Sequence, residues 1–375
     1  MKRIVIAFCG ADPVCRTAAF AAERFDEAAF CFVDPAQKNE RERQNLRAFL
    51  QKRHGVTATF CELPDLLPDT LDPFFDRFTA DAEAVFDLTE ADPRFVSAAT
   101  AYGVTHPNGS LRFYDPAALT AAEHISLCGG KVMRVSGDGS YDFTDPSFQQ
   151  EILRMWQATK DIPNDWNRFC SLPFERENGD FHAVFRRFGG KDDRAIAERV
   201  LRSLARQGVV AQSGVTGAGA SYTLGKAAKT KELYEKSGTA LELFVCLAAA
   251  RCGSFYDAQT GVQIDLDGVV TNAPSDPHNE IDVLAMHRGR PVFISCKNTR
   301  PTKEFLYEIQ TVATSAGGKT AVPVIVSTEP AFPAVSERAR DMDILLLDDL
   351  RTASLKSLKN MLTGFFPKED SIPEN

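Results

Sequence analysis

The sequence predicts an α/β protein built from three successive parts. Short apolar runs alternate with helical stretches over the first third of the chain. A basic helical stretch and a glycine-rich hairpin pattern occupy the middle, and a second set of apolar strands accompanies a fully apolar helix towards the carboxy terminus. A chain of 375 residues with 44% hydrophobic composition can bury a core in each part.

The first part, residues 1–145, has the pattern of a Rossmann-like domain. Helical stretches separate apolar runs that we expect to form a parallel sheet: residues 4–8, 28–33, 58–61 and 83–89. In such sheets ligands bind beyond the carboxyl ends of the strands. Two strand ends therefore supply candidate ligand-binding residues: Gly10, Ala11, Asp12 and Pro13, and Thr89 and Glu90. No Gly-x-Gly-x-x-Gly motif follows the first strand, which argues against a dinucleotide-dependent oxidoreductase.

The end of this part and the central part, residues 146–236, are predicted to be mostly helical. Within residues 119–131, a helix begins at a capping box formed by Thr120 and Glu123 and ends at Gly129, and residues 135–145 form a linker. Further on, a basic helix over residues 192–207 precedes a hairpin over residues 209–224, which is typical of a winged helix. Such a module contacts nucleic acid in some proteins and serves as a packing or dimerisation module in others.

The third part, residues 237–366, begins with an apolar helix and continues with strands over residues 262–266, 281–287 and 291–296. A helix over residues 303–316 precedes two further strands, residues 321–327 and 344–347. Residues 367–375 are predicted to be a disordered tail.

Composition indicates a cytoplasmic protein with a locally basic carboxy-terminal half. The net charge of −8 argues against a protein that coats nucleic acid through its overall field. Residues 182–231 nevertheless hold ten Lys or Arg against three Asp or Glu, and residues 281–320 hold six against three. The nine cysteines form no Cys-x-x-Cys pair, and no signal peptide or membrane span is apparent.

A cluster of charged residues in the third part is a candidate metal-dependent hydrolytic site. Glu280 and Asp282 are two apart on a strand and share one face. Lys297 lies on the next strand, which a tight turn at residues 288–291 makes antiparallel, and Glu242 can approach from the preceding helix. Phosphodiester hydrolysis needs oxygen ligands for Mg²⁺ or Mn²⁺ and a cation near the attacking water. Solvated carboxylates and a lysine that reaches water are the alternative interpretation.

These residues resemble the PD-(D/E)xK, or restriction-endonuclease-like, superfamily. The three-part order further resembles one branch of it, the CRISPR ancillary nucleases of type III systems, in which an amino-terminal CARF domain senses cyclic oligoadenylate. The resemblance extends to residues 119–131, 237–242 and 303–319. It implies that Asp282, Glu242 and the backbone carbonyl of Cys296 hold the metal, that Glu280 assists, and that Lys297 orients the water.

The resemblance also implies a homodimer whose two sensor domains bind one cyclic tetra-adenylate through the strand-end residues named above. The substrates would be DNA and single-stranded RNA, cleaved with little sequence specificity. Two departures from the family pattern bear on this expectation. Ser295 stands where the superfamily usually has a carboxylate, and acidic residues follow Thr89 where a Gly-Gly-Thr-Lys-like turn is common. Ser295 leaves open a second class, a ligand-responsive winged-helix transcription regulator with a degenerate nuclease fold.

Overall fold

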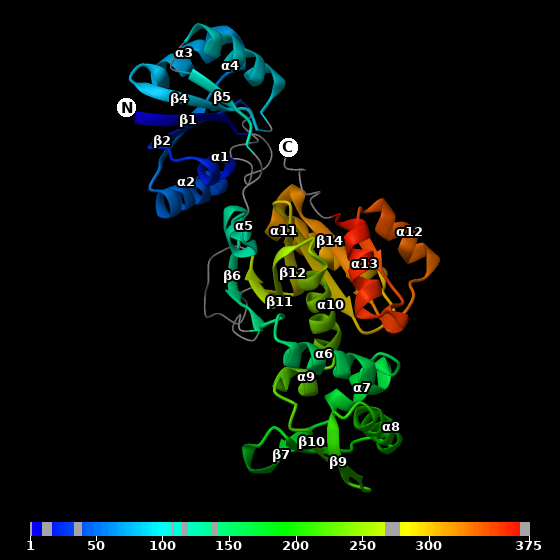
Figure 1. The fold of residues 1–375 in the computed structure, drawn as a ribbon. Helices are drawn as coiled ribbons and strands as arrows, with labels where there is room; N and C mark the ends of the chain where they lie inside the picture. Colours follow the sequence, from blue (N-terminus) through cyan, green and yellow to red (C-terminus); the bar gives the residue numbers. More distant parts are fainter. Residues whose placement is uncertain are drawn as a thin grey trace, which may run out of the picture.

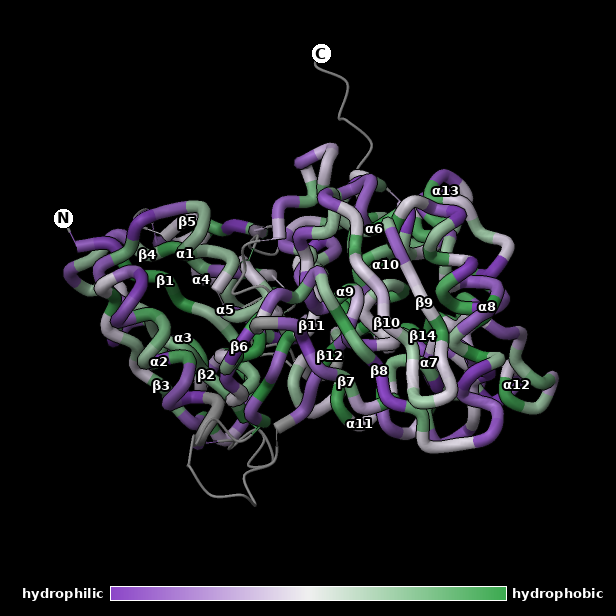
Figure 2. Tube along the Cα trace, turned by 90° about the horizontal axis from the view of Figure 1, so that it is seen from below, coloured by the Kyte–Doolittle hydropathy of each residue, from purple (hydrophilic) through white to green (hydrophobic). Residues whose placement is uncertain are grey.

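The computed structural model describes residues 2–9, 17–33, 40–89, 91–106, 109–114, 119–136, 141–266 and 278–367 (Figure 1). The chain forms three sheets with helices packed around them. Figure 2 shows hydrophobic segments, β1 among them, in the interior and hydrophilic segments along many outer turns. No helix in the described ranges has the length and apolar character needed to cross a membrane.

The first sheet is parallel and has five strands in the order β3-β2-β1-β4-β5, which confirms the predicted parallel sheet. Alternate residues of β1 enter opposite cores, Val5 on one face and Ile4 and Ile6 on the other. Burial on both faces explains why the strands are nearly continuous apolar runs. The elements are β1 (Lys2–Phe8), α1 (Ala18–Ala22), β2 (Glu27–Phe32), α2 (Glu40–His54), β3 (Thr57–Glu62), α3 (Pro68–Thr79), β4 (Ala82–Asp87), α4 (Pro93–Thr105) and β5 (Gly109–Arg112).

The next segment contains the helix that was predicted to begin at Thr120 and end at Gly129, followed by a strand that was not foreseen. Helix α5 (Ala121–Leu127) begins at the predicted capping box of Thr120 and Glu123. It ends just before Gly129, as predicted, where the positive φ of 98° turns the chain. Strand β6 (Lys131–Arg134) follows and pairs antiparallel with β11 at the edge of the third sheet.

The central part contains the predicted helix and hairpin together with two strands that the sequence analysis did not foresee. Its antiparallel sheet has the order β7-β8-β10-β9. Its core is continuous with that of the third part, where the rings of Trp156 and Phe244 stack at 4.7 Å. The elements are α6 (Pro146–Thr159), α7 (Pro163–Ser171), β7 (Phe174–Arg176), β8 (Ala183–Arg187), α8 (Asp193–Arg206), β9 (Val210–Val215), β10 (Gly219–Leu224) and α9 (Lys231–Glu235).

The third sheet has six strands in the order β15-β14-β13-β12-β11-β6 and is covered on both faces. Buried residues of α10 and α13 form one core with it, and those of α5, α11 and α12 form the other. The predicted strands are present, whereas α12 and α13 were not foreseen. The elements are α10 (Thr239–Cys252), β11 (Tyr256–Asp265), β12 (His278–His287), β13 (Arg290–Lys297), α11 (Lys303–Gly317), β14 (Val322–Ser327), α12 (Pro333–Asp341), β15 (Leu345–Leu347) and α13 (Leu355–Phe365).

Candidate active site

The hairpin of β12 and β13 places Asp282 against the backbone of the next strand. Arg288 and Gly289 both have positive φ, 49° and 75°, so two residues reverse the chain. Pairing of the two strands runs from this turn to Val283 and Ile294. Just beyond, the Asp282 carboxylate accepts a hydrogen bond from the Cys296 backbone N–H at 2.6 Å and another from the Ser295 hydroxyl at 3.3 Å.

Glu242 reaches the same place from the first turn of α10, a helix that is otherwise almost wholly buried and apolar. Gly238, just before the helix, leaves room for this carboxylate, because a Cβ atom there would collide with it. Burial, together with the negative charges of Asp282 and Glu280, raises the pKa of Glu242 to about 8. Burial also raises the pKa of Asp282, although the Cys296 hydrogen bond and the charge of Lys297 oppose this.

Lys297 ends β13 and contacts α11. Its Nζ lies 3.9 Å from Glu308 Oε2 and 4.6 Å from the centroid of the Phe305 ring. Its positive charge lowers the pKa of Glu242 and of Asp282 against the stronger effect of burial. The four residues predicted for catalysis therefore lie in one region of the third part, where the charges of Glu280, Asp282 and Lys297 all act on Glu242. The contact with Glu308 was not foreseen, because nothing in the sequence shows which face of α11 turns towards β13.

A cavity of about 50 Å³ lies between the start of α10 and strands β11 and β12, enough for ordered water. Glu242 and Glu280 line it, together with Lys236 and Tyr141. The positive charge of Lys236 lowers the pKa of Glu242, whereas burial and nearby carboxylates raise the pKa of Tyr141 to about 12. Sequence reasoning missed Lys236 and Tyr141, which no motif links to the carboxylates.

Within the described ranges, no three His, Cys, Asp or Glu side chains lie close enough together to hold a metal ion. Glu242 and Asp282 stay predicted ligands, and an ion held by them would have its further positions filled by water or substrate. Mg²⁺ is commonly bound in this way, through one or two carboxylates and several waters. The Cys296 carbonyl stays a predicted ligand.

In the first sheet, Thr89 follows β4, and its hydroxyl is hydrogen-bonded to the segment after β5. Its Oγ1 accepts a hydrogen bond from the Tyr114 N–H at 2.8 Å and lies 3.3 Å from the Tyr114 carbonyl oxygen. Its N–H donates to buried Asp87 at 2.9 Å. The other predicted sensor residues lie outside the described residues: Gly10, Ala11, Asp12, Pro13 and Glu90.

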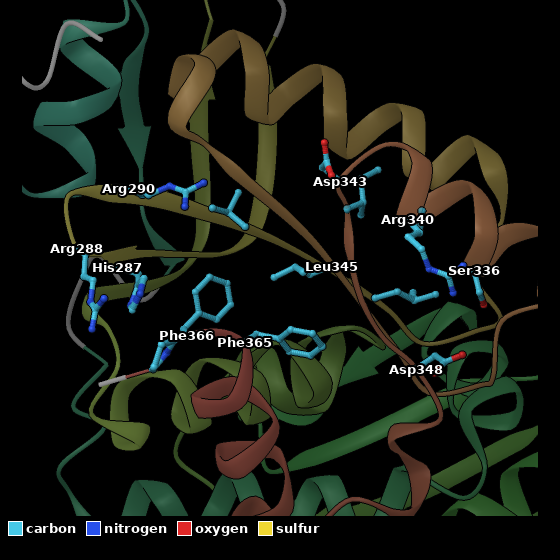
Figure 3. A pocket seen from close by; sticks show the side chains of 15 residues that line it. His287, Arg288, Arg290, Ser336, Arg340, Asp343, Leu345, Asp348, Phe365 and Phe366 are labelled. Atoms are coloured by element: carbon cyan, nitrogen blue, oxygen red, sulfur yellow. The ribbon is translucent and has the colours of Figure 1, made fainter. Parts of the chain in front are cut away.

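A larger cavity, of about 890 Å³, lies at the opposite end of the β12–β13 hairpin (Figure 3). Arg288 and Arg290 come from the turn, Arg340 from the end of α12, and Phe365 and Phe366 from the end of α13. The hairpin separates this cavity from the carboxylates, so it is not part of the candidate active site.

Comparisons with known proteins identify the fold. No protein-family model matches this sequence, and no curated protein matches it. Two solved structures resemble it nearly from end to end. Protein VC1899 from Vibrio cholerae is 14% identical with a TM-score of 0.68, over 97% of this chain and 98% of that one. Can2 from Sulfobacillus thermosulfidooxidans, solved in complex with cyclic tetra-adenylate, is 13% identical with a TM-score of 0.62. This match covers 97% of this chain and 99% of Can2. The chain therefore shares its overall fold with VC1899 and Can2.

Proposed function

We propose that this protein is a cyclic-oligoadenylate-activated, metal-dependent endonuclease of type III CRISPR antiviral defence. It would cleave or nick DNA, and also single-stranded RNA, with little sequence specificity. The observation that carries the proposal is that Asp282, held against β13 by the Cys296 N–H, and Lys297 at the end of β13 lie near enough to the partly buried Glu242 for both charges to act on it. Two partly buried carboxylates beside a lysine suit phosphodiester hydrolysis better than a purely structural role.

The donor set fits Mg²⁺ or Mn²⁺. The pKa values of Glu242 and Asp282 are raised by burial and, for both, by a neighbouring carboxylate, a repulsion that a divalent cation relieves. Such an ion, when bound, polarises the phosphate and lowers the pKa of water. Glu242, Asp282 and the Cys296 carbonyl would hold it, and Glu280 would assist. Lys297, steadied by Glu308, would orient the attacking water and stabilise the negative charge of the transition state.

Activation would come from cyclic tetra-adenylate bound between the first domains of a homodimer. Support comes from the shared fold with Can2, which was solved with that ligand. A two-fold-symmetric ring suits the axis of an isologous dimer. The ring would lie at the carboxyl ends of β1 and β4, beside Thr89, Glu90 and residues 10–13.

The test compares cleavage of plasmid and single-stranded nucleic acid with Mn²⁺, with and without cyclic tetra-adenylate. Wild type should cleave only with the activator, whereas Asp282→Ala and Lys297→Ala should lose at least about 100-fold in rate. Lys356→Ala, an exposed change on α13, is the control and should behave like wild type. Thr89→Ala and Asp12→Ala should weaken activation by cyclic tetra-adenylate and leave the candidate active site intact. Absence of cleavage under every condition would overturn the nuclease proposal.

Ser295 supports a second candidate, a ligand-responsive transcription regulator with a degenerate nuclease fold. Its hydroxyl bonds Asp282 where the superfamily usually has a metal-binding carboxylate. A regulator would bind a specific duplex tightly, with a steep salt dependence, and would not cleave it with Mn²⁺. Selection of bound duplexes from a random pool, followed by sequencing, distinguishes the two.

A further inference from the structure

Two exposed aromatic rings lie beside the candidate active site, each with an arginine against it. The side chains of Tyr307 and Phe332 are 47% and 56% exposed. The guanidinium carbon of Arg338 lies 5.6 Å from the Tyr307 ring centroid, and that of Arg300 lies 4.3 Å from the Phe332 ring centroid. We call these four residues the arginine–aromatic surface.

This surface is continuous with Lys297 through the carboxyl ends of two parallel strands. Lys297 at the end of β13 is in register with Ser327 at the end of β14, and the Thr328 N–H donates to the Lys297 carbonyl at 3.1 Å. Arg300 lies on the loop that leaves β13, and Phe332 ends the loop that leaves β14. In sheets of this kind, ligands bind where such loops begin.

Tyr307 joins the surface to the lysine from the other side. It is next to Glu308 on α11, and Glu308 contacts Lys297. Arg338 reaches Tyr307 from the last turn of α12, and Phe332 lies just before the first turn of the same helix. Arg338 lies six positions after Phe332 along α12, a rise of about 9 Å, which leaves room for more than one base.

We propose that the arginine–aromatic surface receives a single-stranded segment of the nucleic acid and guides it to Lys297. Unpaired bases would stack on Tyr307 and Phe332, while Arg338 would face a phosphate; Arg300, whose Nε lies 3.7 Å from Glu329 Oε2, would hold the Phe332 ring in place. Bases inside a duplex offer no free face to these rings, so the surface selects single strands. This proposal rests on the proposed function and adds the substrate form and the residues that choose it.

The test measures binding in an Asp282→Asn background, which removes a predicted metal ligand and keeps Lys297. Fluorescence anisotropy follows a labelled single-stranded oligonucleotide and the duplex of the same sequence, with cyclic tetra-adenylate present. Tyr307→Leu and Phe332→Leu should each weaken single-strand binding by about 5- to 150-fold and change duplex binding much less. Tyr307→Trp should retain binding, because it keeps a stacking face.

Two matched controls separate this surface from a general loss of apolar area or charge. Phe365 is also 47% exposed but lines the cavity at the far end of the hairpin, so Phe365→Leu should leave binding unchanged. Arg338 and Arg340 are both exposed on α12, and Arg340 faces that cavity (Figure 3). Arg338→Ala should lower the salt dependence of single-strand binding by about one counterion, and Arg340→Ala should not.

The outcomes are decisive for each proposal separately. Unchanged single-strand affinity in both leucine variants, or equal losses for single strand and duplex, overturns the stacking role. If those variants instead shift the protein between monomer and dimer, the surface is a contact between copies. If the wild-type protein cleaves and the Tyr307 and Phe332 variants bind single strands normally, the nuclease proposal holds and the stacking proposal is wrong. If single-strand binding depends on the two rings but the wild-type protein does not cleave, the stacking proposal holds and the nuclease proposal is wrong.

Discussion

At the residue scale, burial and neighbouring charges strongly perturb the Glu242 carboxyl of the candidate site. An ordinary glutamate has a pKa near 4.5, and burial beside Asp282 and Glu280 raises that of Glu242 to about 8. The folded protein therefore binds this proton more tightly than the unfolded chain does. The resulting stability is fully present below about pH 4.5 and is lost as pH rises through about 8.

We predict that the metal-free protein loses thermal stability between pH 5 and pH 8.5 partly through Glu242. Glu242→Gln should flatten this part of the profile and raise Tm at pH 8.5 by a few degrees, because a shift of several pKa units corresponds to a few kcal/mol. Mn²⁺ should restore wild-type Tm at pH 8.5 and do much less for the variant. Thermal unfolding across this pH range measures both effects. Parallel profiles for the two proteins would contradict the assignment.

At the scale of single elements, a buried arginine from another element caps the carboxy-terminal end of α7. Arg186 of β8 is fully buried, and its Nη1 donates to the carbonyls of Phe169, Cys170 and Leu172 at 3.1–3.2 Å. Its Nη2 donates to the Tyr234 carbonyl at 3.2 Å. The last carbonyls of a helix lack partners within the helix, and a cation stabilises this negative end. Arg186 therefore joins α7 to the segment that leads into α10.

Arg186→Met should reduce the free energy of unfolding by at least about 3 kcal/mol, because several buried carbonyls lose their donor. Arg187→Met is the matched control. The Arg187 side chain is 66% exposed and pairs with the exposed Glu175, so its loss should cost less than about 1 kcal/mol. Urea unfolding followed by circular dichroism measures both. Equal effects would show that the buried contacts of Arg186 do not stabilise the fold.

At the scale of the whole molecule, α5 belongs to two cores at once. Leu127 packs with β1, β2 and α2 of the first sheet, whereas Ile125 packs with the third sheet and α11. His124 is buried and lies 2.9 Å from the Gly317 carbonyl at the end of α11 through Nε2. The Ala121 N–H donates to Asp257 of β11 at 2.5 Å. These contacts bind the first domain to the third through one short helix.

Because the cores share α5, we predict that a cavity in one weakens the other. Ile125→Ala should destabilise the protein by about 2–5 kcal/mol and should speed hydrogen exchange in β1 and β2 as well as in β11 and β12. Leu67→Ala, at a side chain that is 58% exposed, is the control. Faster exchange confined to the third sheet would mean that the first domain folds independently of α5.

The sequence alone predicted what depends on local pattern. Continuous apolar runs with intervening helices indicated the parallel sheet, because strands buried on both faces cannot alternate. Thr120 and Glu123 predicted a helix start, since a capping box is formed by neighbours in sequence. The two-residue spacing of Glu280 and Asp282 and the tight turn after β12 were enough to bring Asp282 to β13. Strand β6 was not predicted, because the strand with which it pairs lies more than 100 residues away in the sequence.

Only the tertiary structure decided which side chains surround these residues. The raised pKa of Glu242 comes from burial and from charges on another strand, and no local pattern encodes either. The contact of Lys297 with Glu308 and the two arginine–aromatic pairs depend on how α11 and α12 pack. Periodicity fixes which face of a helix is apolar, because that follows from 3.6 residues per turn. It does not say which polar neighbour the opposite face meets, because that depends on the packing of the whole chain.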